Sequence, residues 1–372
     1  MECEAFVPGL ELARRFHHEA VAPILDREFP KLQYAAGLLG AGSDVVGYDT
    51  ARSMDHDWGP RCLLFLRDED LDAFKPLIDA ALKRELPREF VGFATGVGFH
   101  PDGATRPATA DEPFQHRITI TTPRDSLRWH IGINSLAELN PAVWVTTPQQ
   151  KLLEFTAGAI FRDDTGEITR LREESAWYPD DVWRYLLAGF WKNIAQLEPF
   201  VGRCGEVDDD LGSQLVAMRI VRDQMHLAFL QERRYAPYQK WFGTAFSRLA
   251  IAPELRPHLD RARYATSWQE REAGIVAGSR LLAERHNRME LTPMLDKTPR
   301  PFYNRPFQVL DAERFTRALA DSITDPEVRA LPRDLGGLDT WVDSTDAVGS
   351  QELHRAIRGW MTASPVEVPG QS

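Results

Sequence analysis

Two aspartates separated by one residue, Asp55 and Asp57, are the side chains in this sequence whose type and spacing most clearly suggest chemistry. If residues 53–58 form an extended strand, both carboxylates point to the same face, because alternate residues of a strand share a face. Like charges so close together disfavour each other unless a cation lies between them. Mg²⁺ is the expected cation, since it prefers oxygen ligands. The alternative is a solvated polar turn in front of Gly59 and Pro60.

A glycine-serine pair, Gly42 and Ser43, lies upstream of these aspartates and follows the short apolar run Tyr34–Leu39. The run predicts a buried strand that ends in a turn. At such a turn a glycine lets the backbone approach a phosphate, and N–H groups together with the serine hydroxyl can hold it. A phosphate site beside a metal site suits nucleotidyl transfer, in which the metal holds the triphosphate and activates the incoming hydroxyl.

This arrangement of Gly42, Ser43, Asp55 and Asp57 resembles the motif of the nucleotidyltransferase superfamily that includes DNA polymerase β and the aminoglycoside nucleotidyltransferases. From about residue 8 to 346, the sequence is also similar to a bacterial family known as domain of unknown function 4037. The stretches that carry this second resemblance are Thr156–Phe161, Tyr178–Trp183, Phe229–Trp241 and Leu338–Asp346.

The resemblance implies an α+β fold in which a mixed sheet with helices is followed by an all-helical domain. We expect the nucleotidyltransferase-like domain at 1–175, the helical domain at 176–292, and a proline-rich arm with a C-terminal segment at 293–372. The superfamily usually supplies a third carboxylate from a later strand. Here the expected strand, His116–Thr122, carries no acid. Either a neighbouring acid such as Glu112 or Asp125 takes that role, or His116 does, or the site holds one metal and the chemistry is impaired. For His116, a simple hydrogen-bonded strand histidine is the plainer interpretation.

Several cations could contact phosphate. Arg52 and Arg61 flank the aspartates, and each could instead form a surface salt bridge of little energetic value. A helix predicted over 212–232 has an apolar face and a second, basic face, which is usually a solvated stripe. If the helical domain packs as in the antibiotic nucleotidyltransferases, that face would hold a triphosphate. The basic face comprises Arg219, Arg222, His226 and Arg233.

Lys240 lies beside Trp241 and near two tyrosines, which is typical either of a binding wall or of aromatic residues packed into a core. We select Lys240 and Arg222 as the cations of the helical region. Asp208–Asp210 precedes the helix predicted at 212–232, and the plainer interpretation is an N-terminal cap.

Composition narrows the class of protein. With 372 residues we expect two or three domains, and a net charge of −11 with a pI near 5.5 argues against DNA binding. The three cysteines, Cys3, Cys62 and Cys204, show no zinc-type spacing, and their odd number fits a reducing compartment. There is no signal-like or membrane-spanning stretch, so we expect a cytoplasmic protein with no membrane partner. A homodimer is one oligomeric state that the sequence leaves open.

Periodicity predicts the elements that position these residues. We expect helices at 8–28 (interrupted by Pro23), 70–86, from 179 onward, 212–232, 241–262 and 266–290, short helices at 311–330 and 351–362, and strands at 62–66 and 116–122. Residues 160–168 predict a hairpin that turns at Asp164-Thr165-Gly166.

The sequence therefore predicts a Mg²⁺-dependent nucleotidyltransferase that moves a nucleoside monophosphate from an NTP, most simply ATP, to a hydroxyl of a small-molecule acceptor and releases pyrophosphate. Asp55 and Asp57 would hold the metal, while Gly42 and Ser43 would hold phosphates. The alternatives are a nucleotide-binding pseudoenzyme or regulatory module, and a specialised-metabolite enzyme on the same fold.

Overall fold

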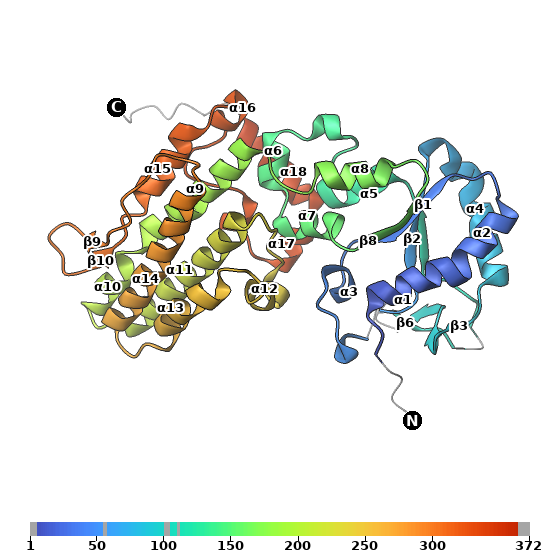
Figure 1. Ribbon diagram of the computed structural model, residues 1–372, viewed down its shortest axis with the longest axis horizontal. Coiled ribbons are helices and arrows are strands. Elements are labelled where there is room, and N and C mark those ends of the chain that lie inside the picture. The colour runs from blue at the N-terminus through green and yellow to red at the C-terminus, as the bar shows by residue number, and fades with distance from the viewer. Residues whose placement is uncertain (1–5, 55–57, 100–104, 110–111, 364–372) are drawn as a thin grey trace. The chain divides into compact units, whose positions relative to one another are not determined.

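The structure is a computed structural model that describes residues 6–54, 58–99, 105–109 and 112–363. It contains two compact units (Figure 1). The first is formed by the described residues up to Glu138 together with Lys151–Ala176. The second is formed by Leu139–Gln150 and the described residues from Trp177 onward.

The first unit is built on a four-stranded mixed sheet in the order β7-β2-β1-β8. Its central strand β1 pairs antiparallel with β2 and β8, and β2 pairs parallel with β7. Gly37 of β1 lies opposite Leu63 of β2, so the carboxyl end of β1 lies beside the amino end of β2. The strands are β1 (Tyr34–Leu38), β2 (Cys62–Leu66), β7 (Ile118–Thr121) and β8 (Ala159–Asp163), with short antiparallel pairs β3 (Glu89–Phe90) with β4 (Phe93–Ala94) and β5 (Val97–Phe99) with β6 (Thr105–Pro107).

Helices cover this sheet, and its main core lies between it and the N-terminal helices with α4. Alternate residues of β2 and β7, such as Leu64 and Ile120, face this core, where they meet Phe16 and Leu82. The helical segments are α1 (Gly9–Phe16), a π-helical turn η1 (His17–Val21), α2 (Ala22–Glu28), α3 (Ser43–Val46), η2 (Ala51–Ser53), α4 (Asp68–Glu85), α5 (Pro123–Ile131), η3 (Leu136–Glu138), α7 (Gln149–Thr156) and α8 (Glu167–Glu174).

Two helices predicted in this unit can be compared with the structure. The helix expected at 70–86 is confirmed as α4. The helix expected at 8–28 is found as α1, η1 and α2; the interruption is the π-helical turn His17–Val21, and Pro23 is the second residue of α2 that follows it.

The hairpin predicted at 160–168 is wrong. β8 runs instead into helix α8. The Asp163 carboxylate accepts hydrogen bonds from the backbone N–H of Gly166 (2.9 Å) and of Thr169 (3.0 Å), which satisfies donors at the start of α8. The Asp-Thr-Gly sequence therefore makes a strand-to-helix turn.

The second unit is helical. α11 packs against both α9 and α14, α13 lies along α14, and α15 packs on α9 (Figure 1). The segments are α6 (Pro141–Thr146), α9 (Asp180–Leu197), α10 (Phe200–Gly205), α11 (Asp210–Gln231), α12 (Gln239–Phe246), α13 (Ala252–Tyr264), α14 (Trp268–Arg288), α15 (Glu313–Ser322), α16 (Pro326–Arg329), η4 (Leu338–Thr340), α17 (Thr345–Gly349) and α18 (Gln351–Thr362), with a small pair β9 (Arg300–Pro301) and β10 (Gln308–Val309).

The helix predicted at 212–232 is confirmed as α11, and the Asp209 side chain caps it by accepting a hydrogen bond from Gly212 N (2.8 Å). The single helix predicted at 241–262 is wrong, because the chain forms α12 and α13 with a connection between them. Within the described part of the chain, no helix is long and apolar enough to span a bilayer.

Candidate functional site

The turn that follows β1 contains the predicted phosphate-binding residues. Gly40 and Gly42 have φ angles of 102° and 144°, a region that glycine adopts readily and other residues avoid. Gly40 N donates to the Glu154 carbonyl (2.9 Å), and Gly158 N donates to the Val45 carbonyl (3.1 Å). The turn is therefore fastened to the neighbouring chain on both sides. Ser43 is the first residue of the one-turn helix α3.

A buried ion pair joins this turn to the start of β2. The Arg61 guanidinium lies 2.8 Å and 2.9 Å from the two carboxylate oxygens of Asp44, which follows Ser43. Burial raises the pKa of the Asp44 carboxyl, and the Arg61 charge opposes that rise. A side chain at Gly42 would collide with both the Asp44 carboxylate and the Arg61 guanidinium, so this position requires glycine for space as well as for φ.

Asp55 and Asp57 lie outside the described residues, and the structure does not test their predicted role. The chain on either side of them is described. Arg52 is exposed in the single turn η2. Trp58 is buried, and its carbonyl accepts a hydrogen bond from the Arg117 guanidinium (2.8 Å). Arg61 forms neither of the contacts predicted for it, a surface salt bridge or a contact with phosphate. Its guanidinium is instead paired with the buried Asp44 carboxylate.

His116 lies just before β7 and has a structural environment. Its Nδ1 accepts a hydrogen bond from Ile118 N (3.2 Å), and its Nε2 lies 3.2 Å from an oxygen of Asp79 on α4. Burial lowers the pKa of His116, and the Asp79 charge opposes this effect. These contacts are those expected of a hydrogen-bonded strand histidine.

β7 itself presents no carboxylate. Ile118 and Ile120 face the core, and Thr119 and Thr121 alternate with them. Of the nearby acids considered from the sequence, Glu112 is paired with Arg106 (2.9 Å), which contributes most to lowering the pKa of Glu112 to about 2. Asp125 lies 3.4 Å from the Arg128 guanidinium. Among the described residues there is no group of three or more His, Cys, Asp or Glu side chains that could hold a metal ion.

Arg222 belongs to the second unit, where its charge opposes the pKa rise of two acids, Asp223 and Asp339. Asp223 is fully buried, 3.5 Å from the Arg219 guanidinium and 4.0 Å from that of Arg222. Burial raises the pKa of Asp223 to about 6 against the opposing charges of the two arginines. Burial likewise raises the pKa of Asp339 to about 6, with Gln149 N donating to that carboxylate (3.1 Å) and the Arg222 charge opposing the rise.

His226 is not part of a solvated basic face, contrary to the sequence prediction. Its ring is buried and stacks on Phe190 and Phe242, with ring centroids 4.8 Å and 4.5 Å apart. Burial lowers the pKa of His226 well below its usual value, so the ring is neutral in the folded protein.

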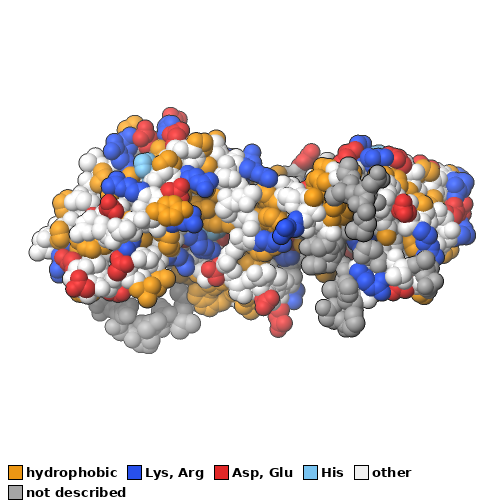
Figure 2. Space-filling model, turned by 90° about the horizontal axis from the view of Figure 1, so that it is seen from below, with side chains coloured by type: hydrophobic (Ala, Val, Ile, Leu, Met, Phe, Trp, Pro, Cys, Tyr) orange, Lys and Arg blue, Asp and Glu red, His pale blue; other side chains and the backbone are white. Residues whose placement is uncertain are grey.

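The face of the molecule seen in Figure 2 shows Lys and Arg side chains interspersed with Asp and Glu.

Lys240 is exposed, and its Nζ lies 4.8 Å from the centre of the Trp241 ring. Tyr235, by contrast, is buried among Trp177 and Tyr178. The aromatic segment around Lys240 is therefore divided between a packed core and a solvent-facing cation. Two glutamines that sequence periodicity did not single out anchor this segment: Gln149 Oε1 accepts from Ala236 N (2.9 Å) and Gln150 Oε1 accepts from Tyr238 N (2.8 Å).

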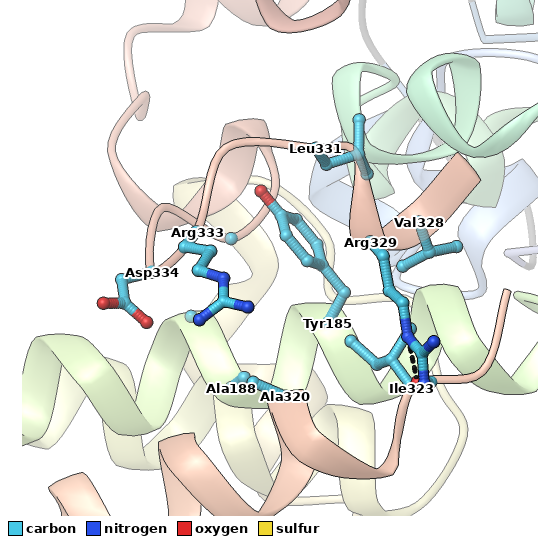
Figure 3. Close-up of a pocket in the computed structure, with 11 residues that line it drawn as sticks. Tyr185, Ala188, Ala320, Ile323, Val328, Arg329, Leu331, Arg333 and Asp334 are labelled. Atoms are coloured by element: carbon cyan, nitrogen blue, oxygen red, sulfur yellow. Dashed lines mark hydrogen bonds between the residues drawn. The ribbon is translucent and has the colours of Figure 1, made fainter. Parts of the chain in front are cut away.

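A small cavity in the second unit lies against Tyr185 (Figure 3). Its volume is about 50 Å³, room for a few water molecules at most. The Tyr185 hydroxyl donates to the Pro332 carbonyl (2.7 Å), and Arg329 Nε donates to the Ile323 carbonyl (2.7 Å). These polar groups fasten the chain around the cavity, which is a packing feature and not a ligand site.

Comparison with known proteins gives a family resemblance. Residues 144–242 match the model of the family described as domain of unknown function (DUF4037). The chain resembles DUF4037. Three of the four stretches that suggested this family from the sequence lie in the matched range; Leu338–Asp346 lies beyond it.

No curated protein matches the chain. A solved structure, the nucleotidyltransferase-like protein from Exiguobacterium sibiricum 255-15, aligns over 82% of this chain and 88% of its own length, with 10% identity and a TM-score of 0.33. The chain is thus similar to DUF4037 and to a nucleotidyltransferase-like protein. The predicted α+β class, with a mixed sheet and a helical second unit, is confirmed.

Proposed function

We propose that this chain is a Mg²⁺-dependent nucleotidyltransferase that transfers a nucleoside monophosphate from an NTP to a hydroxyl of a small molecule. The observation that carries the proposal is the Asp44–Arg61 ion pair. It fastens the glycine turn after β1 to the start of β2, a few residues after Asp57. The pair thus joins the turn that carries Gly42 and Ser43 to Arg61, which follows Asp57 by four positions in the sequence.

In this reaction the acceptor oxygen attacks the α-phosphorus and forms a new P–O bond. The bond from that phosphorus to the bridging oxygen of the β-phosphate breaks, pyrophosphate leaves, and the acceptor hydroxyl gives its proton to water. Asp55 and Asp57 would hold Mg²⁺, which fits the all-oxygen donor set that this ion prefers. Backbone N–H groups at Gly42 and Ser43 would contact the phosphates.

The basic residues predicted to contact phosphate differ in how available their charge is. Exposed Arg52, in the unit that carries the glycine turn, has charge available for phosphate contact, whereas exposed Lys240 belongs to the second unit. Arg222 faces buried Asp223 and Asp339, so its first role is to balance those acids. His116 is not the base we propose, because both ring nitrogens are engaged by Ile118 and Asp79.

The test of transfer uses α-labelled NTPs, Mg²⁺ and a mixture of small-molecule hydroxyl acceptors. The proposal predicts pyrophosphate release together with label in a new product. Asp55→Asn should abolish both while its melting temperature without ligand stays close to that of the wild type. Full turnover by Asp55→Asn would rule out the assignment.

A second candidate, a nucleotide-binding pseudoenzyme, is favoured by the absence of a carboxylate on β7. It predicts that NTP with Mg²⁺ raises the melting temperature of the protein, whereas no acceptor leads to pyrophosphate release.

A further inference from the structure

A cavity of about 510 Å³ lies in the second unit between α11, α12 and α13. This volume falls in the range of small-molecule binding sites. None of its lining residues belongs to the proposed nucleotide site. They are Val221 and Met225 from α11; Gly243, Thr244 and Phe246 from α12; Ser247; and Arg256, Leu259, Asp260 and Arg263 from α13.

Gly243 keeps the cavity open. It lies inside α12, where glycine lowers helix stability relative to alanine. Its φ is not positive, and a Cβ added there would meet no atom within 4 Å. Neither backbone strain nor a close approach therefore requires glycine. The preceding residue, Phe242, contacts His226 and Phe229 instead, which leaves the Gly243 side of α12 unfilled.

The walls of the cavity are held in place by Glu232 at the end of α11. Its carboxylate accepts hydrogen bonds from Ala250 N (3.0 Å) and Ile251 N (2.9 Å), which lie in the connection between α12 and α13. The Arg285 guanidinium lies 3.4 Å from the same carboxylate. The space between these helices is thus formed before any ligand binds, which reduces the entropic cost of binding.

The chemistry of the lining combines an apolar surface with a cation. Met225, Leu259 and Phe246 supply the apolar surface. Arg256 is already paired with Asp260 (3.4 Å). Arg263 lies over the Tyr264 ring, 4.7 Å from its centre, and among the ion pairs between described residues none involves Arg263. Its guanidinium can therefore donate two parallel hydrogen bonds to a carboxylate or phosphate.

We propose that this cavity binds a small organic anion, with one carboxylate or phosphate group at Arg263 and an apolar body against Met225 and Leu259. This inference does not depend on nucleotidyl transfer, since it uses no residue of the glycine turn or of the Asp55–Asp57 segment.

The test uses three naphthalene probes that share one apolar body: 2-naphthoate, 2-naphthyl phosphate and the neutral 2-naphthamide. Binding to the full-length chain is followed by the methyl NMR signal of Met225, one of seven methionines, assigned by its loss in Met225→Leu. We expect a saturable shift of this signal with at least one of the two anions, and about tenfold weaker binding of the amide.

Two pairs of variants separate charge from volume. Arg263→Gln should remove the preference for the anion, whereas Arg261→Gln, an exposed arginine of α13 outside the cavity, should retain it. Gly243→Leu should fill the cavity and weaken binding by about tenfold or more. Gly359→Leu in α18, where a Cβ also meets open space, is the matched control.

The proposal is overturned if neither anion shifts the Met225 signal, if the amide binds as well as both anions, or if Gly243→Leu and Gly359→Leu bind the probes equally. None of these outcomes bears on nucleotide binding, so failure here leaves the proposed function to its own test.

Discussion

The guanidinium of Arg61 and the carboxylate of Asp44 lie 2.8 Å apart, and this contact joins two segments that the sequence separates. Asp44 follows the glycine turn at the end of β1, and Arg61 directly precedes β2. Because β1 and β2 are antiparallel, these ends meet at one edge of the sheet. The ion pair explains how a turn rich in glycine keeps a defined position at the start of β2.

Arg61→Ala should destabilise the protein by about 3 kcal/mol, because it leaves the buried Asp44 charge without a partner. It should also reduce any nucleotide-induced rise in melting temperature. Chemical denaturation measures the first effect. Arg84→Ala removes an exposed arginine paired with Glu85 (2.6 Å) and should cost much less. Equal losses for the two variants would show that the Asp44 pair has no special role.

Gly158→Ala should be more damaging than Gly166→Ala, although both glycines have a left-handed φ, 72° and 70°. At Gly166 a Cβ meets open space, so the cost is the backbone strain alone, about 1–2 kcal/mol. At Gly158 a Cβ would collide with the Leu38 carbonyl and force β8 away from β1. Chemical denaturation of both variants tests this difference, and similar stabilities would contradict the described approach of the two strands.

The contribution of His286 to stability should fall as the pH drops below about 6.5. This ring is buried beside Trp191 and Phe315, with Nε2 3.0 Å from the Thr292 hydroxyl oxygen, and burial lowers its pKa to about 4. Between pH 6.5 and 4 the unfolded chain binds a proton at this histidine that the folded chain does not. The contribution of His286 to the free energy of unfolding should therefore decrease by up to about 3 kcal/mol over this window.

His286→Gln should remove that part of the pH dependence. Urea denaturation of the wild type and the variant between pH 7 and pH 4 gives the comparison. Other groups that titrate in this window affect both proteins equally, so the difference between the curves isolates His286. Parallel curves would mean that its pKa is not lowered in the folded protein.

Periodicity predicted those parts of the fold that local patterns determine. The apolar run Cys62–Leu66 forms β2, and the spacing of apolar residues places α4 and α11 correctly. The helix predicted at 241–262 was wrong because a side chain outside that segment decides its backbone. Glu232 binds the N–H groups of Ala250 and Ile251 and so holds the break between α12 and α13, which no local pattern reveals.

The same limit applies to the candidate site. Glycine and serine after an apolar run correctly indicated a turn at the end of β1. The Asp44–Arg61 pair depends on the register between β1 and β2, which cannot be read from the sequence. The reading of His226 as a basic surface residue failed because helical spacing gives its position on α11 but not the aromatic rings of Phe190 and Phe242 that enclose it.

The most direct measurement is the melting temperature of the chain with each NTP, with and without Mg²⁺, for the wild type and for the Asp55→Asn/Asp57→Asn double variant. A ligand that binds only the folded state raises the melting temperature by mass action. The account predicts a Mg²⁺-dependent rise with at least one NTP in the wild type, and its loss in the double variant. No rise with any nucleotide, or an equal rise in both proteins, would contradict it.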